Sequence, residues 1–215
     1  MEFCFPKIYP ILDASVFPSV ALGRAEFLER LGNELAAAGV TLLEYRNKTG
    51  GFEELLADAA ILRRACPDGQ VKLILDDRAD LVDRAGFDGA HVDSGDMNPA
   101  EARWLLGPDS IIGTFGGSET ILPGILNEPV DYLSIGPVFP TQTKQTTKAP
   151  IGADGVRKLR QGAGASAILV GVGGITLVTA PAIIEAGATA VAVSAAIFRA
   201  ADPAAEFRRW KAELG

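Results

Sequence analysis

Two hydrophobic patterns alternate along the chain. In the longer segments, among them residues 24–39, 52–65 and 177–187, apolar residues recur every three or four positions, and several of these segments end at glycine. That spacing places apolar side chains on one face of a helix, and a glycine commonly follows the last helical residue. We therefore predict amphipathic helices in these segments.

The shorter apolar runs predict strands. Several of them lack polar alternation, which is typical of a parallel sheet whose two faces are both covered. We place strands at residues 7–13, 41–46, 71–77, 89–93, 110–115, 131–136, 167–174 and 190–196. Dividing 215 residues by eight leaves about 27 for each strand–helix unit, enough to close a barrel. We therefore expect residues 1–215 to form an α/β protein with a single (β/α)8 TIM barrel domain.

An open, doubly wound sheet is the alternative fold. Such a sheet would need a dinucleotide-binding glycine fingerprint or a clear reversal of strand order. The glycine-rich stretch at residues 171–174 lacks the full fingerprint and lies in the seventh unit, not the first. The barrel is therefore the favoured reading.

Composition and charge narrow the class of ligand. Hydrophobic residues make up 48% of the chain, and the net charge of −7 argues against a nucleic-acid or membrane-surface partner. No apolar run approaches the roughly 20 residues that span a bilayer, and the N-terminal residues do not form a signal peptide. We expect a cytoplasmic protein with two reduced cysteines. A small anionic ligand needs only local positive charge, and the sequence leaves a homo-oligomer open.

Carboxylates follow two neighbouring predicted strands. Asp76 comes after four apolar residues, and Asp96 lies 20 positions later, beyond the next strand. Two carboxylates together with phosphate oxygens and water suit Mg²⁺. The sequence therefore predicts a Mg²⁺ site at Asp76 and Asp96, with Asp77 as a cap of the following helix. The alternative is that Asp76 merely ends a strand.

Three charged residues alternate at the end of the second predicted strand. Glu44, Arg46 and Lys48 fall on the same side of an extended chain. If that side is the barrel interior, Arg46 can hold a phosphate with two parallel donors while Lys48 acts as a point charge. An outward ion-pair cluster is the alternative.

The loop after the sixth strand has the residues of a phosphate site. Its two prolines reduce the entropy lost on ordering, Thr141 and Thr143 offer hydroxyl donors, and Lys144 adds positive charge. Gly173 and Gly174 follow the seventh strand, where glycines expose backbone N–H groups. The loops after strands seven and eight form the recurrent phosphate cradle of such barrels. The alternatives are a flexible polar loop and a simple glycine-eased turn.

Three further residues lie at or near the predicted strand ends. Thr114 and Ser194 end the fifth and eighth strands and are candidate ligand-binding residues. His91 is the only histidine, and we expect a lone strand histidine to be packed and hydrogen-bonded, not catalytic. No local spacing suggests a nucleophile with a histidine partner.

Together these motifs resemble those of the thiamine phosphate synthase family. The most specific matches are "DYLSIGPVFPTQTK", "VGVGGIT" and "AGATAVAVSAAIF", supported by "DGAHVDSGD" and "EYRNK". The resemblance runs along nearly the whole chain. It implies a (β/α)8 barrel and a transferase that couples an aminopyrimidine methyl pyrophosphate to a thiazole phosphate, releasing pyrophosphate.

The resemblance also implies roles for individual residues. Catalytic contacts to pyrophosphate would come from Arg46, Lys48 and Lys144. Mg²⁺ would be held by Asp76 and Asp96. The thiazole phosphate would be bound by Thr141, Thr143, Gly173 and Gly174.

Three positions depart from the family pattern. Glu44 stands where glutamine is usual, Leu75 where asparagine is usual, and Phe115 near a pyrophosphate-binding serine that Thr114 or Ser118 could replace. These departures leave two alternative functions open. One is an isomerase related to thiazole tautomerase, and the other is a non-catalytic protein that binds a phosphate ligand.

Overall fold

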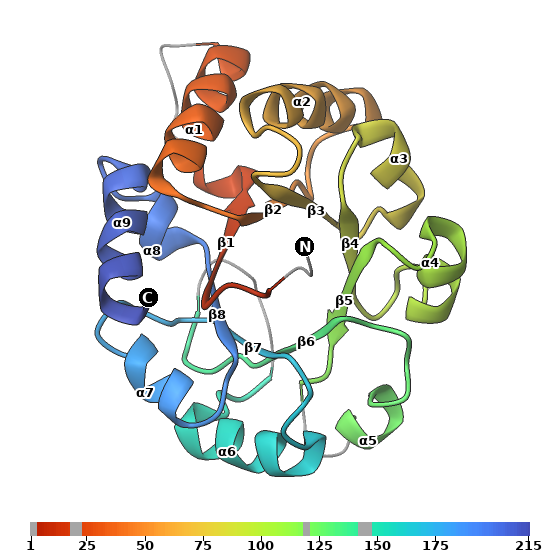
Figure 1. The fold of residues 1–215 in the computed structure, drawn as a ribbon, viewed down its shortest axis with the longest axis vertical. Helices are drawn as coiled ribbons and strands as arrows, with labels where there is room; N and C mark the ends of the chain where they lie inside the picture. Colours follow the sequence, from red (N-terminus) through yellow and green to blue (C-terminus); the bar gives the residue numbers. More distant parts are fainter. Residues whose placement is uncertain (1–3, 18–22, 118–120, 142–147) are drawn as a thin grey trace.

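The strands form a closed parallel barrel. The computed structural model describes residues 4–17, 23–117, 121–141 and 148–215. The strands are β1 (Ile8–Asp13), β2 (Leu42–Arg46), β3 (Lys72–Asp76), β4 (Gly89–Val92), β5 (Ile111–Phe115), β6 (Tyr132–Ile135), β7 (Leu169–Val172) and β8 (Ala190–Val193). Each strand pairs in parallel with the next, and β8 pairs with β1 (Figure 1). The predicted barrel is confirmed, because an open sheet would leave β1 and β8 unpaired with each other.

Helices surround this barrel on the outside (Figure 1). They are α1 (Arg24–Ala38), α2 (Phe52–Ala65), α3 (Val82–Ala85), α4 (Pro99–Leu106), α5 (Leu122–Ile125), α6 (Gly152–Ala163), α7 (Ala180–Glu185), α8 (Ala195–Phe198) and α9 (Pro203–Leu214), with 3-10 turns η1 (Ala14–Val16) and η2 (Ala79–Leu81). The helix α1 ends as predicted at Gly39, which adopts a left-handed φ of 88° and donates its N–H to the carbonyl of Leu35. Among the described residues, no helix has the length and apolarity needed to cross a membrane.

The helix α7 is shorter than the pattern predicts. It begins at Ala180, although apolar spacing extends the predicted helix back to residue 177. The backbone N–H of Thr176 donates to the Thr179 hydroxyl at 3.0 Å, and the two hydroxyls lie 3.1 Å apart. These local bonds satisfy the backbone in a turn, which competes with helix formation.

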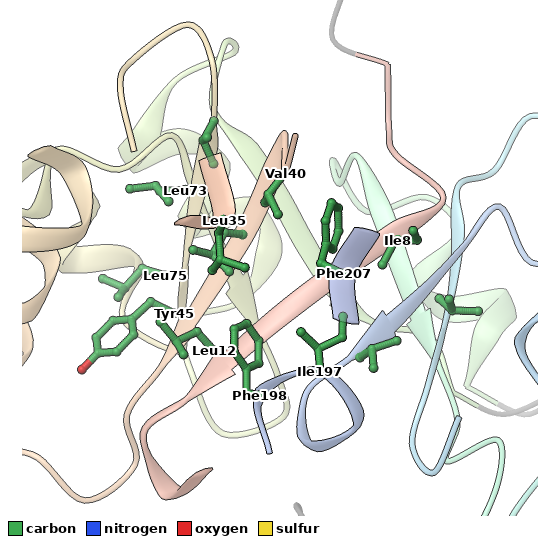
Figure 2. Packing of buried hydrophobic residues seen from close by; sticks show 14 of the residues in the cluster. Ile8, Leu12, Leu35, Val40, Tyr45, Leu73, Leu75, Ile197, Phe198 and Phe207 are labelled. Atoms are coloured by element: carbon green, nitrogen blue, oxygen red, sulfur yellow. The ribbon is translucent and has the colours of Figure 1, made fainter. Parts of the chain in front are cut away.

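Most of the apolar core lies between the strands and the helices. Leu12 on β1, Leu35 on α1 and Phe198 on α8 belong to this core, and the Tyr45 side chain of β2 extends away from Phe198 (Figure 2). The Tyr45 hydroxyl donates to Asp58 on α2. These side chains are almost fully buried. Burial of apolar area on this scale is the main term that favours the folded barrel.

A smaller apolar cluster fills the barrel interior. Its members include Phe5, which precedes β1, and Leu42, Ile74, Ile111 and Tyr132 from the strands. This packing closes the amino-terminal end of the barrel, so a ligand can enter only at the carboxyl ends of the strands. Polar side chains on the inner face are consequently grouped at that open end.

Candidate active site

A cavity of about 400 Å³ opens at the carboxyl ends of the strands. All eight strands contribute side chains to its wall. The predicted site residues that line it are Glu44, Arg46, Asp76, Thr141, Gly173, Gly174 and Ser194. Residues separated by up to 150 positions in the sequence therefore meet in one cavity, as expected from the barrel topology.

Arg46 points into the cavity and is held between two carboxylates. Its Nε lies 3.1 Å from Oδ2 of Asp76, and its Nη1 contacts the carboxylate of Asp13. Burial lowers the pKa of Arg46, but the charges of Asp76 and Asp13 more than compensate and raise that pKa above its ordinary value. Arg46 is thus a charged donor inside the barrel, and the alternative of an outward ion-pair cluster is wrong for this residue.

Lys48 stands beyond the end of β2 and reaches toward the loop after β3. Its Nζ lies 3.5 Å from Oδ2 of Asp76 and contacts the carboxylate of Asp77 more closely. Burial lowers the pKa of Lys48, but the charges of Asp76 and Asp77 outweigh burial and raise this pKa above its ordinary value. Lys48 therefore stands next to Arg46, which lines the cavity, and both cations contact the carboxylate of Asp76.

The prediction that Asp77 caps a helix is wrong. Asp77 takes a left-handed φ of 65°, and the residue that precedes the turn η2 is Arg78, whose side chain makes no capping bond. The Asp77 carboxylate instead contacts Lys48 and faces the carboxyl of Asp96. A short polar side chain such as aspartate tolerates this backbone conformation better than most residues.

The carboxyl of Asp96 lies next to that of Asp77. Its Oδ2 accepts the backbone N–H of Asp93 at 2.9 Å. Burial raises the pKa of Asp96, the Asp93 N–H opposes that shift, and the nearby Asp77 adds to it. One carboxylate oxygen of Asp77, Oδ1, is buried without a hydrogen-bond partner. Among the residues that the structure describes, the cation that contacts this pair is Lys48, through Asp77.

Among the described residues, no group of three or more histidine, cysteine, aspartate or glutamate side chains could hold a metal ion. A cation at the Asp77–Asp96 pair would therefore take its remaining ligands from water and from a bound phosphate. That ligand set, with one or two protein carboxylates, is the one Mg²⁺ commonly accepts.

The loops after β6 and β7 form the opposite wall of the cavity. The backbone N–H of Val138 donates to the carbonyl of Val172 at 2.8 Å, and that of Phe139 to Gly173 at 3.0 Å. Gly173 and Gly174 have φ values of 96° and 64°, and a Cβ on Gly174 would collide with the Pro140 carbonyl. Glycine is therefore required where the two loops touch.

Two of the predicted phosphate-binding residues of this wall are described, together with the glycines. Thr141 lines the cavity, and so does Ser194, whose hydroxyl is buried without a hydrogen-bond partner. Thr143, Lys144 and Ser118 lie outside the described residues. Their predicted roles consequently stay predictions.

Thr114 does not belong to the cavity. Its hydroxyl donates to the carbonyl of Val92 at 2.7 Å, and its side chain is buried. Side chains alternate along β5, so Phe115 faces the cavity while Thr114 faces away. The ammonium of Lys148 lies 3.6 Å from the centre of the Phe115 ring, which places an aromatic and a cation at the rim.

Buried polar side chains form the floor of the cavity. The Tyr9 hydroxyl donates to Oε2 of Glu44 at 2.7 Å and lies 2.9 Å from the Tyr132 hydroxyl. Nδ1 of His91 is 3.1 Å from that same Tyr132 hydroxyl, and the two rings stack. His91 is packed and hydrogen-bonded, as predicted, and it also lines the cavity.

Sequence reasoning missed several cavity residues, among them Tyr9, Tyr132 and Arg199. Both tyrosines lie within apolar strand runs, where only the strand register could show that their hydroxyls point inward. Arg199 lies five positions after Ser194, one helical turn beyond the start of α8. That spacing was the available signal, because it returns a side chain to the face on which the helix begins.

The comparisons with known proteins agree with this geometry. Residues 8–197 match the family described as thiamine monophosphate synthase. A thiamine-phosphate synthase from Koribacter versatilis is 42% identical over 193 residues, which cover 88% of each chain. One from Chloroflexus aurantiacus is 32% identical over 206 residues, 96% of this chain and 91% of the relative.

The chain belongs to the thiamine monophosphate synthase family. A solved structure of thiamine phosphate pyrophosphorylase from Pyrococcus furiosus has a TM-score of 0.81 to this chain, covering 97% of it and 95% of the other. Because the two sequences are 24% identical, this similarity is evidence for a shared fold alone. A 3-hexulose-6-phosphate synthase shares the same barrel, with a TM-score of 0.68 and 18% identity over 98% and 100% of the two chains.

The structure revises one departure from the thiamine monophosphate synthase family pattern. Leu75 points outward into the apolar core and is fully buried, so it cannot replace a polar cavity residue. The β3 side chain that faces the cavity is that of Asp76. Of the three departures, Glu44 and Phe115 line the cavity.

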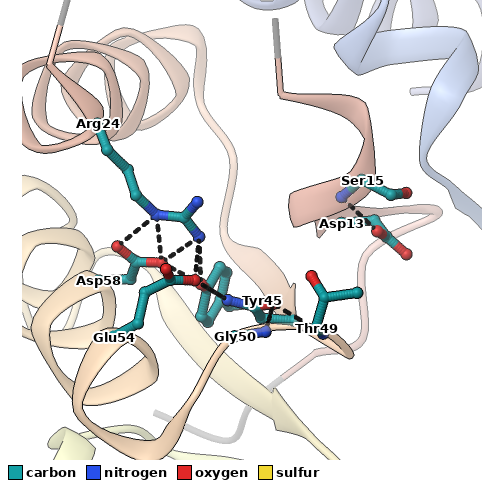
Figure 3. A network of polar contacts seen from close by, with 9 residues as sticks. Asp13, Ser15, Arg24, Tyr45, Thr49, Gly50, Glu54 and Asp58 are labelled. Carbon is teal, nitrogen blue, oxygen red and sulfur yellow. Dashed lines mark hydrogen bonds and ion pairs between the residues drawn. The ribbon is translucent and has the colours of Figure 1, made fainter. Parts of the chain in front are cut away.

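A second polar network holds the loop that presents Lys48. The carboxylate of Asp58 on α2 accepts two hydrogen bonds from Arg24 on α1, at 2.9 and 2.6 Å to Oδ2, and one from the Tyr45 hydroxyl (Figure 3). Asn47 donates to the same hydroxyl at 3.2 Å and accepts the Gly50 N–H at 2.8 Å. The turn after β2 is thereby tied to two helices.

Replacing Asp58 with alanine is expected to lower the free energy of unfolding by about 2–3 kcal/mol, because it removes the acceptor of the buried Tyr45 hydroxyl and leaves Arg24 paired with the more exposed Glu54. Urea unfolding followed by circular dichroism measures this loss. Glu53→Ala, an exposed carboxylate on the same helix, is the matched control and is expected to change stability by less than about 0.5 kcal/mol. Equal losses in the two variants would contradict the role of the network.

Proposed function

We propose that this chain is a thiamine-phosphate synthase, which joins an aminopyrimidine methyl pyrophosphate to a thiazole phosphate and releases pyrophosphate. One observation carries the proposal: Arg46, with Lys48 beside it at Asp76, and a wall that contains Thr141, Gly173 and Gly174 belong to the surroundings of one cavity of about 400 Å³. Two phosphorylated substrates need two such anion sites. The family relationship supports the same reaction.

Each wall of the cavity has a separate role in this proposal. Arg46 and Lys48, with Lys144, bind the pyrophosphate and neutralise the charge that grows on it as it leaves. Thr141, Thr143 and Ser194 donate hydroxyl hydrogen bonds to the thiazole phosphate, and Gly173 and Gly174 let its oxygens approach the backbone.

The reaction needs charge stabilisation and positioning more than a strong base. The C–O bond of the pyrimidine methylene breaks, and its electron pair leaves with the pyrophosphate. The resemblance to the family implies carbocation character at that carbon. The lone pair of the thiazole nitrogen then forms the new C–N bond, and the nitrogen takes the positive charge. Preorganised cations around the leaving group are the largest source of rate in such a step.

Asp77 and Asp96 are the residues we propose to hold Mg²⁺. The buried, unpartnered Oδ1 of Asp77 and the facing carboxyl of Asp96 fit a divalent cation, and this changes the sequence-based assignment of Asp76. When bound, Mg²⁺ supplies additional positive charge to the pyrophosphate oxygens. Asp76 instead orients Arg46 and Lys48.

Two alternative functions have weaker support. An isomerase related to thiazole tautomerase needs no metal-binding carboxylate pair, whereas this chain has one in Asp77 and Asp96. A non-catalytic binder is suggested by Glu44 and Phe115, yet both cations of the pyrophosphate wall are present. The synthase accounts for both features.

The deciding experiment incubates the purified chain with both substrates and follows thiamine phosphate by mass spectrometry. We expect product only when both substrates and Mg²⁺ are present, and a loss of at least about tenfold in rate on chelation with EDTA. Reactions that omit one substrate are the controls. Conversion of the thiazole phosphate alone would instead identify an isomerase, and binding of both ligands without product would identify a binding protein.

A further inference from the structure

Glu44 occupies an unusual position on the inner face of β2. Its side chain is only 3% exposed, yet it lines the cavity. Its Oε2 accepts the hydroxyl proton of Tyr9 at 2.7 Å. Within the described part of the chain, no donor is assigned to the other carboxyl oxygen, Oε1, and no ion pair within 4 Å involves Glu44.

The hydrogen bonds of the floor run in one direction and end at Glu44. Because Tyr9 donates to Oε2, its oxygen is free to accept the Tyr132 hydroxyl at 2.9 Å. The Tyr132 oxygen then accepts from Nδ1–H of His91 at 3.1 Å. Oε2 of Glu44 is therefore held as an acceptor by Tyr9, and in this arrangement a proton on the carboxyl is carried by Oε1.

The surroundings of Glu44 favour its neutral form. Burial, followed by the negative charge of Asp76, raises the pKa of Glu44, and Tyr9 and Arg46 oppose the shift; together these effects bring the pKa to about 8. The charged and titratable groups that face it are Tyr9 from β1, Arg46 from β2, Asp76 and the following Asp77 from β3, and Tyr132 from β6. These surroundings favour the protonated carboxyl at neutral pH.

We propose that Glu44 acts as a neutral carboxylic acid that recognises the amino-substituted edge of the pyrimidine substrate. Oε1 donates its proton to a ring nitrogen, and Oε2, which already accepts from Tyr9, accepts from the amino group beside that nitrogen. A carboxylic acid and an aminopyrimidine form such a paired contact because each has one donor next to one acceptor. An ionised glutamate has no donor and could make only half of it.

The position of Glu44 selects the pyrimidine over the thiazole. Glu44 lies two residues before Arg46, on the wall that holds the pyrophosphate cations, and the pyrimidine is the ring attached to the pyrophosphate. A thiazole has a single ring nitrogen, which the reaction itself uses. This inference rests on the proposed function for the identity of the substrate, but the charge state of Glu44 can be tested without it.

The first test measures stability. A carboxyl that is neutral in the folded protein and ionised in the unfolded chain makes the fold less stable as pH rises from about 4.5 to about 8. Glu44→Gln removes that loss. The melting temperature of Glu44→Gln relative to wild type is therefore expected to be higher at pH 8.5 than at pH 5.5, by on the order of 5 °C. Glu29→Gln, at an exposed position on α1, is the matched control and should show no such trend.

The second test measures recognition. With a pKa of about 8, the neutral fraction of Glu44 falls about tenfold between pH 7 and pH 9. The KM for the pyrimidine pyrophosphate is expected to rise about tenfold more over this range in wild type than in Glu44→Gln, because glutamine keeps its donor at every pH. Comparing the two proteins cancels the titration of the substrate and of other residues.

The outcomes separate the two proposals. If wild type forms no thiamine phosphate, the proposed function fails, and calorimetric dissociation constants for the same pyrimidine pyrophosphate replace KM. Parallel pH profiles in wild type and Glu44→Gln would overturn the role of Glu44 even in an active synthase. Equal melting-temperature differences at the two pH values, or no binding of the pyrimidine at any pH, would overturn it as well.

Discussion

Replacing Arg46 with alanine is expected to lower kcat by a factor on the order of 10²–10³, the usual cost of losing one preorganised charged donor in a transition state. Arg46 lines the cavity with a side chain that is 15% exposed, against 41% for Lys48. Charge develops on the leaving pyrophosphate as the C–O bond breaks, so the loss should fall on kcat more than on KM. Steady-state kinetics with both substrates measure the two parameters.

The variant must be separated from a folding defect. Removing Arg46 leaves the buried carboxylates of Asp13 and Asp76 without their shared partner, which costs stability as well. Arg46→Lys keeps the charge and loses the two-pronged donor, so it should fold while kcat still falls by about tenfold or more. Arg208→Ala, an exposed arginine on α9, is the control with unchanged kinetics. A kcat within threefold of wild type in a folded Arg46→Ala protein would remove the proposed role.

The sequence predicted the barrel because its signals are local and repeated. Uninterrupted apolar runs separated by amphipathic segments define parallel strands covered by helices, and eight of them in 215 residues leave few other arrangements. The meeting of Arg46 with Gly173 follows from that topology alone, since all strands of such a barrel end at the same rim. The barrel and the shared rim could therefore be predicted without knowing any contact between side chains.

Single-residue assignments at the strand ends could not be obtained in this way. Whether Asp76 or Asp77 faces Asp96 depends on the residue at which the strand ends and the chain turns. Asp77 adopts a left-handed φ of 65°, which the local sequence pattern does not predict. The assignment of Thr114 failed for a related reason. Strand alternation was applied to β2 but not to β5, where it turns Thr114 away from the cavity and Phe115 toward it.

The charge state of Glu44 is even harder to predict from the sequence. Read alone, a glutamate in place of glutamine suggests a carboxylate that repels phosphate. Its ionisation is set by burial and by Asp76, 32 positions away, with Tyr9 from a third strand holding one oxygen. Only the assembled barrel brings these groups together, so the substitution could not be interpreted before the register of the strands was known.

The placement of the metal site leads to the second large effect. Asp77→Asn is expected to raise the Mg²⁺ concentration needed for half-maximal activity by on the order of 100-fold, because an amide oxygen binds this cation more weakly than a carboxylate. Asp96→Asn should do the same. Asp76→Asn is the matched control on the adjacent residue, and its Mg²⁺ requirement should change by less than about threefold if Asp76 only orients Arg46 and Lys48.

Binding of Mn²⁺ in the presence of pyrophosphate, followed by electron paramagnetic resonance, provides a readout that does not depend on turnover. Asp77→Asn and Asp96→Asn should each weaken Mn²⁺ binding, whereas Asp76→Asn should leave it close to wild type. The geometry supports this order because the Asp77 carboxyl faces that of Asp96, while the Asp76 carboxylate lies 3.1 Å from the Arg46 guanidinium. The reverse order, with Asp76→Asn the most damaging to Mn²⁺ binding, would return the metal to the residue that the sequence alone indicates.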